Sequence, residues 1–417
     1  MNESFLTLKN PILRKNVMGF FAPRLDRIKH SPSNSSTQRV REMRAQGRDV
    51  IGLTIGEPDF DTPDNVKRAA ERAMAHNETR YTTVDGTEQL KDAVRLKFKR
   101  DNQLDYARDQ ISVGTGAKQL IFNAMMTTLS AGDEVIVPAP HWVSYTDIVL
   151  VADGTPVTVA CGESTGFKLT AEQLEGAITP RTKWLILNSP SNPTGATYSR
   201  AELRALADVL VRHPHVWVLT DDIYEHLLFD GRSFTTIAQV EPSLYDRTFT
   251  VNGVSKAYAM TGWRIGFGGG PKALVGNMAK LQSQSTSNPA SISQAAALEA
   301  LIGPQEVVGS RTRELQRRRD VVVPMLNAAP GLRCLTPEGA FYVFPNCSAL
   351  IGKSLSDGRL IETDQDFALY LLDHGVAGIP GTAYGLSPFL RLSIAADQET
   401  LIKACERIQR ACQALHT

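Results

Sequence analysis

The amino-acid sequence predicts an α/β protein with a large domain, built on a mostly parallel sheet covered by helices, and a smaller α+β domain. From about residue 50 onward, short apolar runs alternate with helical patterns, and this strand–helix–strand order is typical of parallel sheets. The last third differs, because a long arginine-rich helical segment precedes several short strands. The 417 residues are 42% hydrophobic and 21% charged, which is typical of globular domains and excludes disorder over most of the chain.

Capping signals and apolar runs locate the elements of the large domain. Thr62, Pro63 and Asp64 supply a cap, a first-turn proline and an acid, so a helix is expected to start there. Ser199 and Glu202 form a capping box that opens a second helix. A third helix is expected to follow residue 116. The candidate strands are 110–113, 135–137, 184–187, 216–219 and 248–251.

The small domain is expected to combine both ends of the chain. The N-terminal segment is too short to bury a core of its own, so we expect it to pack against the C-terminal third. There the pattern predicts helices at about 311–326, 364–374 and 398–414, and strands at about 341–344, 376–379 and 390–394. The predicted division is an N-terminal extension at 1–21, small-domain residues at 22–60, the large domain at 61–310 and the remaining small domain at 311–417.

Charge, hydropathy and cysteine usage exclude several classes of protein. The 45 basic residues balance 44 acidic ones, so no net field attracts nucleic acid or an anionic membrane. No apolar run approaches the ~18 residues that span a bilayer. The five cysteines are odd in number and include no C-x-x-C pair, which argues against a disulfide framework or a structural zinc site. Reduced thiols in the cytoplasm are the expectation.

The N-terminus does not fit a secretory signal. Lys9, Arg14 and Lys15 are present, but a long apolar stretch and an A-x-A cleavage site are missing. Met18 offers a second start. Residues 1–17 are therefore expected either to extend the mature chain or to lie outside it.

Three loops that follow candidate strands are possible ligand sites, although each also has an ordinary structural explanation. Residues 114–119 read Gly-Thr-Gly-Ala-Lys-Gln, which fits a phosphate cradle at a helix N-terminus or a tight turn. In the segment 188–195, two prolines hold the amide of Asn192 rigidly at the carboxyl end of a strand, where open α/β sheets bind ligands. Asp221 ends the next strand, and it either caps a helix or faces a cationic nitrogen.

The segment 253–266 carries the strongest chemical signal. Lys256 follows a strand among small and apolar neighbours, and Arg264 lies eight residues further on. A partly desolvated lysine loses its proton easily and can form a Schiff base, while an arginine suits a phosphate. Together with Asp221 and the glycine-rich loop, these residues call for a flat ligand with a phosphate, an aldehyde and a ring nitrogen. Pyridoxal 5'-phosphate meets all four demands.

Along its whole length, this segment resembles the lysine signature of the class I aminotransferases of the pyridoxal-phosphate fold-type I group. The resemblance covers about residues 22–415 and implies a seven-stranded sheet in a large cofactor-binding domain. Within the family, the chain is most similar to bacterial aspartate aminotransferases of subgroup one-beta and to prephenate aminotransferases. Further matches, in family order, are 56–60, 80–81, 140–145, 188–195, 221–224 and Arg391.

The resemblance implies a role for each residue around the cofactor ring. Lys256 would hold the cofactor covalently and then move a proton as the base. Asp221 would face the pyridine nitrogen and keep it protonated. Tyr224 and Asn192 would hydrogen-bond the phenolic oxygen, and Trp142 would stack on the ring face.

The resemblance also implies how the phosphate is held. Gly116, Ala117 and Lys118 would present backbone N–H groups to it, with Arg264 as the counter-ion. Tyr81 would reach the phosphate of the other subunit, which implies a homodimer with shared active sites.

The substrate contacts are implied in the same way. Arg391 would clamp the α-carboxylate in a bidentate fork, with the backbone of Gly56 on the same group. The side chain of Lys118 would meet the distal carboxylate. Trp142 and Asn192 would also border the substrate.

Two positions depart from the family pattern. His141 stands where a tyrosine is usual, and this change is expected to affect the packing or pH response of the ring site. Ala117 replaces a glycine but keeps its backbone N–H, so phosphate binding should survive. The same replacement occurs in prephenate-type relatives.

These implications lead to aspartate:2-oxoglutarate transamination by a ping-pong mechanism as the expected activity. Prephenate transamination, in the same site, is the alternative. More distant possibilities are aromatic or alanine transamination, C–S lysis and cyclopropane synthesis on the same fold. A cofactor-sensing DNA-binding regulator lacks room for its extra domain, and an NAD-linked oxidoreductase lacks the third glycine of its motif.

Overall fold

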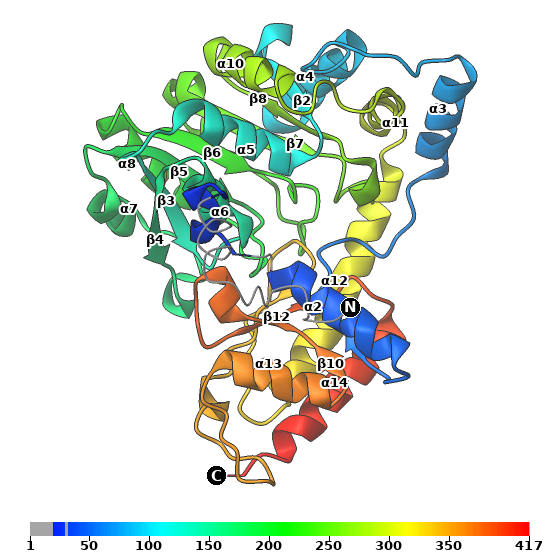
Figure 1. Ribbon diagram of the computed structural model, residues 1–417, viewed down its shortest axis with the longest axis vertical. Coiled ribbons are helices and arrows are strands. Elements are labelled where there is room, and N and C mark those ends of the chain that lie inside the picture. Colours follow the sequence, from blue (N-terminus) through cyan, green and yellow to red (C-terminus); the bar gives the residue numbers. More distant parts are fainter. Residues whose placement is uncertain (1–19, 30–31, 417) are drawn as a thin grey trace.

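The computed structural model describes residues 20–29 and 32–416 (Figure 1). The expected extension at 1–21 therefore lies outside the described residues, except for its last two positions. Within the described residues, no helix is long and apolar enough to cross a membrane.

Seven strands of the described chain form one large sheet in the order β2-β8-β7-β6-β5-β3-β4. The pairs β3–β4, β3–β5, β5–β6 and β6–β7 are parallel, and β8 runs antiparallel to β2 and β7. The mostly parallel seven-stranded sheet is thereby confirmed. The strands are β2 Ile111–Gly114, β3 Glu134–Ala139, β4 Thr155–Ala160, β5 Thr182–Asn188, β6 Trp217–Asp221, β7 Thr248–Gly253 and β8 Gly266–Gly269.

Two of these strands have weak sequence signals. The edge strand β4 has only exposed and half-exposed residues and contains Pro156. The strand β8 is almost all glycine, a residue that is depleted in strands. Its glycines are needed for close packing, because a Cβ at Gly269 would overlap the ring of Tyr106.

Helices cover both faces of the sheet because strand side chains alternate between faces (Figure 1). Ile186 and Leu219 pack with helices α5, α6 and α10 on one face. Leu185 and Val218 pack with α7, α8 and α9 on the other. Helices α3, α4 and α11 surround the β2–β8 edge. Their bounds are α3 Asp64–Ala75, α4 Glu88–Asn102, α5 Ala117–Thr128, α6 Ser144–Val151, α7 Ala171–Ala177, α8 Arg200–Arg212, α9 Ile237–Val240, α10 Lys272–Ser283 and α11 Ser291–Ile302.

Both predicted helices begin at the expected places, but only one of the two predicted side-chain caps forms. Ser199 and Glu202 form the expected reciprocal capping box at the start of α8. The prediction for Thr62 is wrong, because α3 begins at Asp64 without a side-chain cap. The Thr62 hydroxyl instead donates to the backbone oxygen of Ala259 at 2.8 Å and accepts from Trp263 Nε1 at 3.0 Å. A tertiary contact has replaced the local cap.

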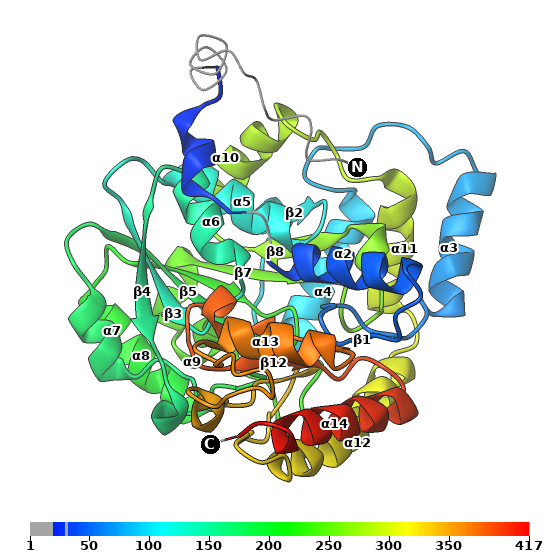
Figure 2. The ribbon, with the colours of Figure 1, turned by 60° about the horizontal axis from the view of Figure 1, so that its bottom comes forward.

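The remaining elements gather below the large sheet (Figures 1 and 2). Strand β1 pairs in parallel with β10, which joins the N-terminal segment to the C-terminal third. Strands β11, β12 and β9 form an antiparallel sheet. The elements are α2 Pro32–Ala45, β1 Ile51–Gly52, α12 Glu306–Asn327, β9 Tyr342–Val343, α13 Asp364–Asp373, β10 Val376–Ala377, β11 Ile379–Pro380, β12 Leu390–Ser393 and α14 Gln398–Gln413.

Helix α12 begins five residues earlier than expected and extends from the large domain into this lower layer (Figure 1). Helices α13 and α14 pack there on a core of buried apolar residues. Helix α2 is held through Val40 and Met43 against Val50 and Ala377. The domain boundaries at residues 60 and 310 stay predictions.

Candidate active site

A cavity of about 650 Å³ lies between the two layers, at the carboxyl ends of β5, β6 and β7. This is the edge at which open α/β sheets bind ligands. Of the twelve site residues expected from the sequence, ten line this cavity, and they are Gly56, Ala117, Lys118, Trp142, Asn192, Asp221, Tyr224, Lys256, Arg264 and Arg391.

Lys256 follows β7 and extends into the cavity. Its Nζ donates to the backbone oxygen of Gly56 at 2.5 Å and lies 5.9 Å from the ring centre of Tyr224. Burial lowers the pKa of Lys256 to about 8. A pKa of about 8 gives this amine a larger uncharged fraction at neutral pH than an ordinary lysine has, and a lysine nucleophile reacts in its uncharged form.

Asp221 ends β6 and presents an unsatisfied oxygen to the cavity. Its Oδ2 accepts from Tyr145 Oη at 2.6 Å, whereas Oδ1 has no hydrogen-bond partner among the described residues. The residue is 5% exposed, and burial raises the pKa of Asp221 to about 6. Because an unpaired buried carboxylate is costly, Oδ1 is suited to a protonated ring nitrogen supplied by a ligand.

Arg391, on β12, presents a guanidinium fork from the opposite side. One Nη donates to Asn192 Oδ1 at 3.1 Å and the other to the backbone oxygen of Thr54 at 2.5 Å. Its Nε finds no hydrogen-bond partner in the described chain. The ring of Tyr342 lies 4.5 Å from its Cζ. A buried arginine with a free donor fits a ligand carboxylate.

The start of α5 provides an anion cradle. Gly116 precedes the helix with a φ of 87° and no side-chain cap, which leaves the N–H groups of Ala117 and Lys118 for a ligand. The N–H of Gly116, also expected at the phosphate, instead donates to the backbone oxygen of Gly114 at 2.8 Å. A Cβ at Gly116 would overlap the guanidinium of Arg264, so glycine is what allows this arginine to approach the helix end. Arg264 itself is anchored by an Nη1 bond to the backbone oxygen of Thr261 at 2.7 Å. These residues fit a phosphate.

Comparison with known proteins gives the family. The family model "Aminotransferase class I and II" matches residues 48–408. The chain belongs to this family. Class I aminotransferases use pyridoxal phosphate, and the unsatisfied Asp221, the buried lysine and the anion cradle fit that cofactor.

Two relatives of high sequence identity are named as aminotransferases that act on aspartate. The chain is 59% identical over 399 residues to the aspartate/prephenate aminotransferase of Cereibacter sphaeroides. The alignment covers 95% of this chain and all of that protein. It is 58% identical to an aspartate aminotransferase of Rhizobium meliloti, over 90% of this chain and 92% of that one.

Two solved structures match over nearly their whole length. The aspartate aminotransferase of Rhizobium meliloti aligns with a TM-score of 0.93 at 56% identity, covering 95% of this chain and 99% of that one. The aspartate aminotransferase of Thermus thermophilus with maleate aligns with a TM-score of 0.87 at 41% identity, covering 94% and 99%.

Lys118 and Trp142 form the outer wall of the aminotransferase cavity. Lys118 Nζ lies 4.8 Å from the centre of the indole ring. Partial burial of the ammonium group lowers the pKa of Lys118, and the nearby charge of Arg264 adds to this effect. Its side chain forms no ion pair within the described residues, so the charge is available to a ligand anion.

Tyr81 and Gly116 are the two expected site residues that do not line the cavity, and His141, which departs from the family pattern, does not line it either. Tyr81 is 89% exposed and lies outside the cavity. His141 is buried behind Trp142, and its Nδ1 lies 3.0 Å from the backbone oxygen of Trp142. Burial lowers the pKa of His141. This histidine therefore supports the cavity wall from behind and does not line the ring site.

The sequence reasoning assigned no role to several residues that complete the site. Tyr145 donates to Asp221, and Tyr342 Oη lies 2.9 Å from Tyr224 Oη. Burial raises the pKa of Tyr224, and the neighbouring Tyr342 contributes. Asn188 joins two loops, because it donates to the backbone oxygen of Asp221 at 2.7 Å and accepts from the backbone N–H of Asn192 at 2.8 Å. A polar residue that ends an apolar strand was the available signal for Asn188.

Proposed function

We propose that this aminotransferase moves the amino group of aspartate to 2-oxoglutarate, giving oxaloacetate and glutamate, by a ping-pong mechanism. The observation that carries the proposal is a pair of cations, Arg391 and Lys118, that border one cavity without an acidic partner in the described chain. A dicarboxylic substrate brings two charges, and each needs a fixed cation. The names of the relatives at 58–59% identity support the same reading.

The proposed roles follow the site chemistry. Bound pyridoxal phosphate supplies an aldehyde for the amino group and a protonated ring that draws electrons from the substrate α-carbon. Lys256 binds the cofactor and moves the α-proton. Asp221 keeps the ring nitrogen protonated, and Tyr224 with Asn192 bonds the phenolic oxygen. Trp142 covers one ring face.

The remaining roles concern the anionic groups of cofactor and substrate. The backbone N–H groups of Ala117 and Lys118, which follow the turn at Gly116, bind the cofactor phosphate, which Arg264 neutralises. Arg391 binds the α-carboxylate together with the backbone of Gly56. The side chain of Lys118 is left to bind the distal carboxylate.

A panel of amino donors tests the proposed activity. The purified enzyme is given aspartate, glutamate, alanine or phenylalanine, and the specificity constant kcat/KM is measured for each with 2-oxoglutarate or oxaloacetate as acceptor. Aspartate and glutamate should exceed the monocarboxylic donors. A specificity constant for alanine or phenylalanine equal to that for aspartate would refute the proposal.

Prephenate transamination is the second candidate, and one observation favours it. The relative from Cereibacter sphaeroides is named an aspartate/prephenate aminotransferase at 59% identity. Prephenate also has two carboxylates, so Arg391 and Lys118 could serve both substrates. Formation of arogenate from prephenate and aspartate tests this second activity directly.

Lys118→Ala should weaken dicarboxylic substrates selectively. Losing one charged hydrogen bond should reduce kcat/KM for aspartate, glutamate and prephenate by ~1.5–3 kcal/mol of transition-state stabilisation. The specificity constants for alanine and phenylalanine should change much less. Lys118→Arg, which keeps the charge, is the matched control and should retain most of the dicarboxylate preference. Equal losses for both substrate classes would assign Lys118 to the cofactor instead.

A homodimer with shared active sites is part of the proposal, supported by the 89% exposure of Tyr81. Tyr81→Ala and Lys256→Ala should each have little activity alone. In a co-expressed mixture, hybrid dimers contain one site with both residues intact, so about a quarter of wild-type activity should return. An active monomer in light scattering, or a mixture without recovery, would place Tyr81 outside the partner's site.

A cytoplasmic location is also proposed. All five cysteines, each of which lies in the described chain, are buried free thiols. Burial raises the pKa of each to about 12. Unpaired thiols of this kind are typical of reducing compartments.

A further inference from the structure

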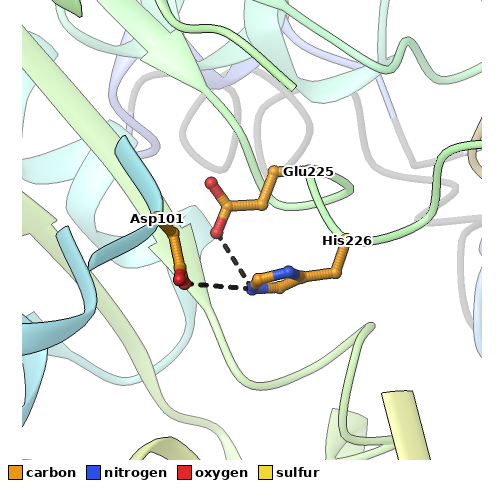
Figure 3. A group of neighbouring side chains, drawn as sticks. All are labelled: Asp101, Glu225 and His226. Carbon is orange, nitrogen blue, oxygen red and sulfur yellow. Dashed lines mark ion pairs between the residues drawn. The ribbon is translucent and has the colours of Figure 1, made fainter. Parts of the chain in front are cut away.

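A cluster of buried and half-buried charges lies beside the active site, where the end of α4 meets the turn that follows β6. Figure 3 shows three of its members, with His226 Nε2 lying 3.1 Å from Glu225 Oε1 and 3.6 Å from Asp101 Oδ2. Such a triad has the composition of a metal site. However, the ammonium group of Lys97 already forms an ion pair with Glu225 Oε1. Lys97 therefore already supplies a cation to this cluster, and no metal ion is needed to balance the charge of Glu225.

Glu225 is held by partners on both of its oxygens. Lys97 is 1% exposed, and its Nζ donates to Asn102 Oδ1 at 2.6 Å as well as pairing with Glu225. Asn102 Nδ2 in turn donates to Glu225 Oε2 at 2.8 Å. Although burial opposes ionisation, the charge of Lys97 holds the pKa of Glu225 well below its usual range. Two residues of α4 thus fix a single carboxylate in one orientation.

Glu225 closes the turn that carries two residues of the ring site. Its backbone N–H donates to the oxygen of Asp222 at 3.0 Å, and Leu227 N–H donates to the oxygen of Tyr224 at 2.8 Å. Asp221, at the start of the turn, is fixed by strand pairing with β5 and β7. At the far end, the buried side chain of Glu225 is anchored in α4 by Lys97 and Asn102, and the half-exposed His226 adds a longer contact to Asp101 of the same helix. The position of Tyr224 therefore depends on Glu225.

We propose that the buried Lys97–Glu225 pair is a positioning device that holds the turn presenting Asp221 and Tyr224 to the cofactor ring. The proposal rests on the roles of Asp221 and Tyr224 in the proposed function. Neither Lys97 nor Glu225 lines the cavity, so the pair acts through the turn. Its charge balance also matters, because removal of Lys97 would leave Glu225 close to the acid Asp222, and breaking one side of a buried ion pair is strongly unfavourable.

The test compares three variants of the full-length enzyme. Glu225→Gln keeps the shape of the side chain, and Lys97→Met keeps the apolar stem of the lysine; each removes one charge of the pair. Lys99→Met is the matched control, because Lys99 lies on the same helix in an exposed pair with Asp105 at 3.0 Å. The measurements are the dissociation constant of pyridoxal phosphate from the apoenzyme, the pH titration of the bound cofactor's visible absorbance, and kcat and KM. All are made well below each variant's melting temperature.

Glu225→Gln and Lys97→Met should each raise the cofactor dissociation constant about tenfold, the size of one weakened polar contact. Their absorbance titrations should shift in pH, and kcat should fall with little change in KM. Lys99→Met should match the wild type in all of these. Since Glu225→Gln is nearly isosteric, the test holds even if Lys97→Met fails to fold.

Wild-type cofactor affinity and an unchanged titration in folded Glu225→Gln would overturn the inference and leave the pair with a purely structural role. This failure is distinguishable from failure of the proposed function. In the former case Asp221→Ala still inactivates the enzyme, whereas in the latter Asp221→Ala itself turns over normally.

Discussion

Lys256→Ala should abolish transamination and leave a folded protein that still binds pyridoxal phosphate without a covalent link. The amine is the only group that we assign both to cofactor attachment and to movement of the α-proton. Removing a general base costs ~10²–10⁴-fold by itself, and the loss of nucleophilic attachment adds to this. Turnover measured by production of the amino-acid product should therefore fall at least ~10⁴-fold.

The chemical position of the link can be checked independently of activity. Borohydride reduction of the native enzyme, followed by peptide mapping, should label Lys256. The exposed Lys280 on α10 is a suitable control, and Lys280→Ala should keep both the label and the activity. Label on another lysine would refute the assignment of Lys256.

From the sequence alone, a ligand site could be predicted at residues whose chemistry is unusual in their local setting. A lysine among small and apolar residues at a strand end points to a ligand by itself, whereas a carboxylate after an apolar strand also fits a helix cap and is assigned to a ligand only together with that lysine. The carboxyl ends of parallel strands meet at one edge, so the sheet prediction also places Asn192, Asp221 and Lys256 near one another. The cavity lining agrees with that grouping.

Residues that act through tertiary contact could not be predicted in this way. Tyr342 is part of an apolar strand pattern, and its hydroxyl meets Tyr224 only because β9 packs under the large domain. Lys97 occurs in a helix rich in lysine and arginine, which predicts a solvated residue, yet it is 1% exposed. Thr62 shows the same limit in another way: its local pattern predicts a helix cap, but its hydroxyl bonds the distant backbone oxygen of Ala259 instead. Local patterns do not specify which distant side chain a polar group will meet.

Substitution of Asp221 should remove most activity and should not weaken the fold. In Asp221→Ala the ring nitrogen loses the carboxylate that keeps it protonated, so the ring can no longer accept electrons from the α-carbon. A charge-assisted pair in a site shielded from water is strong, and we expect a loss of ~10³-fold or more in kcat. Near-normal turnover would refute the role.

Stability of the apoenzyme distinguishes this role from a structural one. Burial raises the pKa of Asp221 to about 6 from an ordinary value of 3.8, so ionisation of the carboxylate opposes folding at neutral pH. A shift of this size corresponds to about 3 kcal/mol. Asp221→Asn keeps an acceptor for the Tyr145 hydroxyl and removes the charge. The Asn variant, as apoenzyme, should therefore be more stable than the wild type at pH 7, by up to about 3 kcal/mol.

The difference in stability between the Asp221→Asn and wild-type apoenzymes should change with pH in one direction. The advantage of Asp221→Asn should be full above pH 6, shrink as the pH falls from about 6 towards 4, and vanish once the wild-type carboxyl is protonated in both the folded and unfolded states. Denaturant unfolding of the two apoenzymes at several pH values measures this difference. If the charge of Asp221 served the fold, as one side of a buried ion pair does, the Asn variant would be the less stable one at pH 7. A more stable but inactive variant is the result that only a carboxylate held in place for a cationic ligand nitrogen explains.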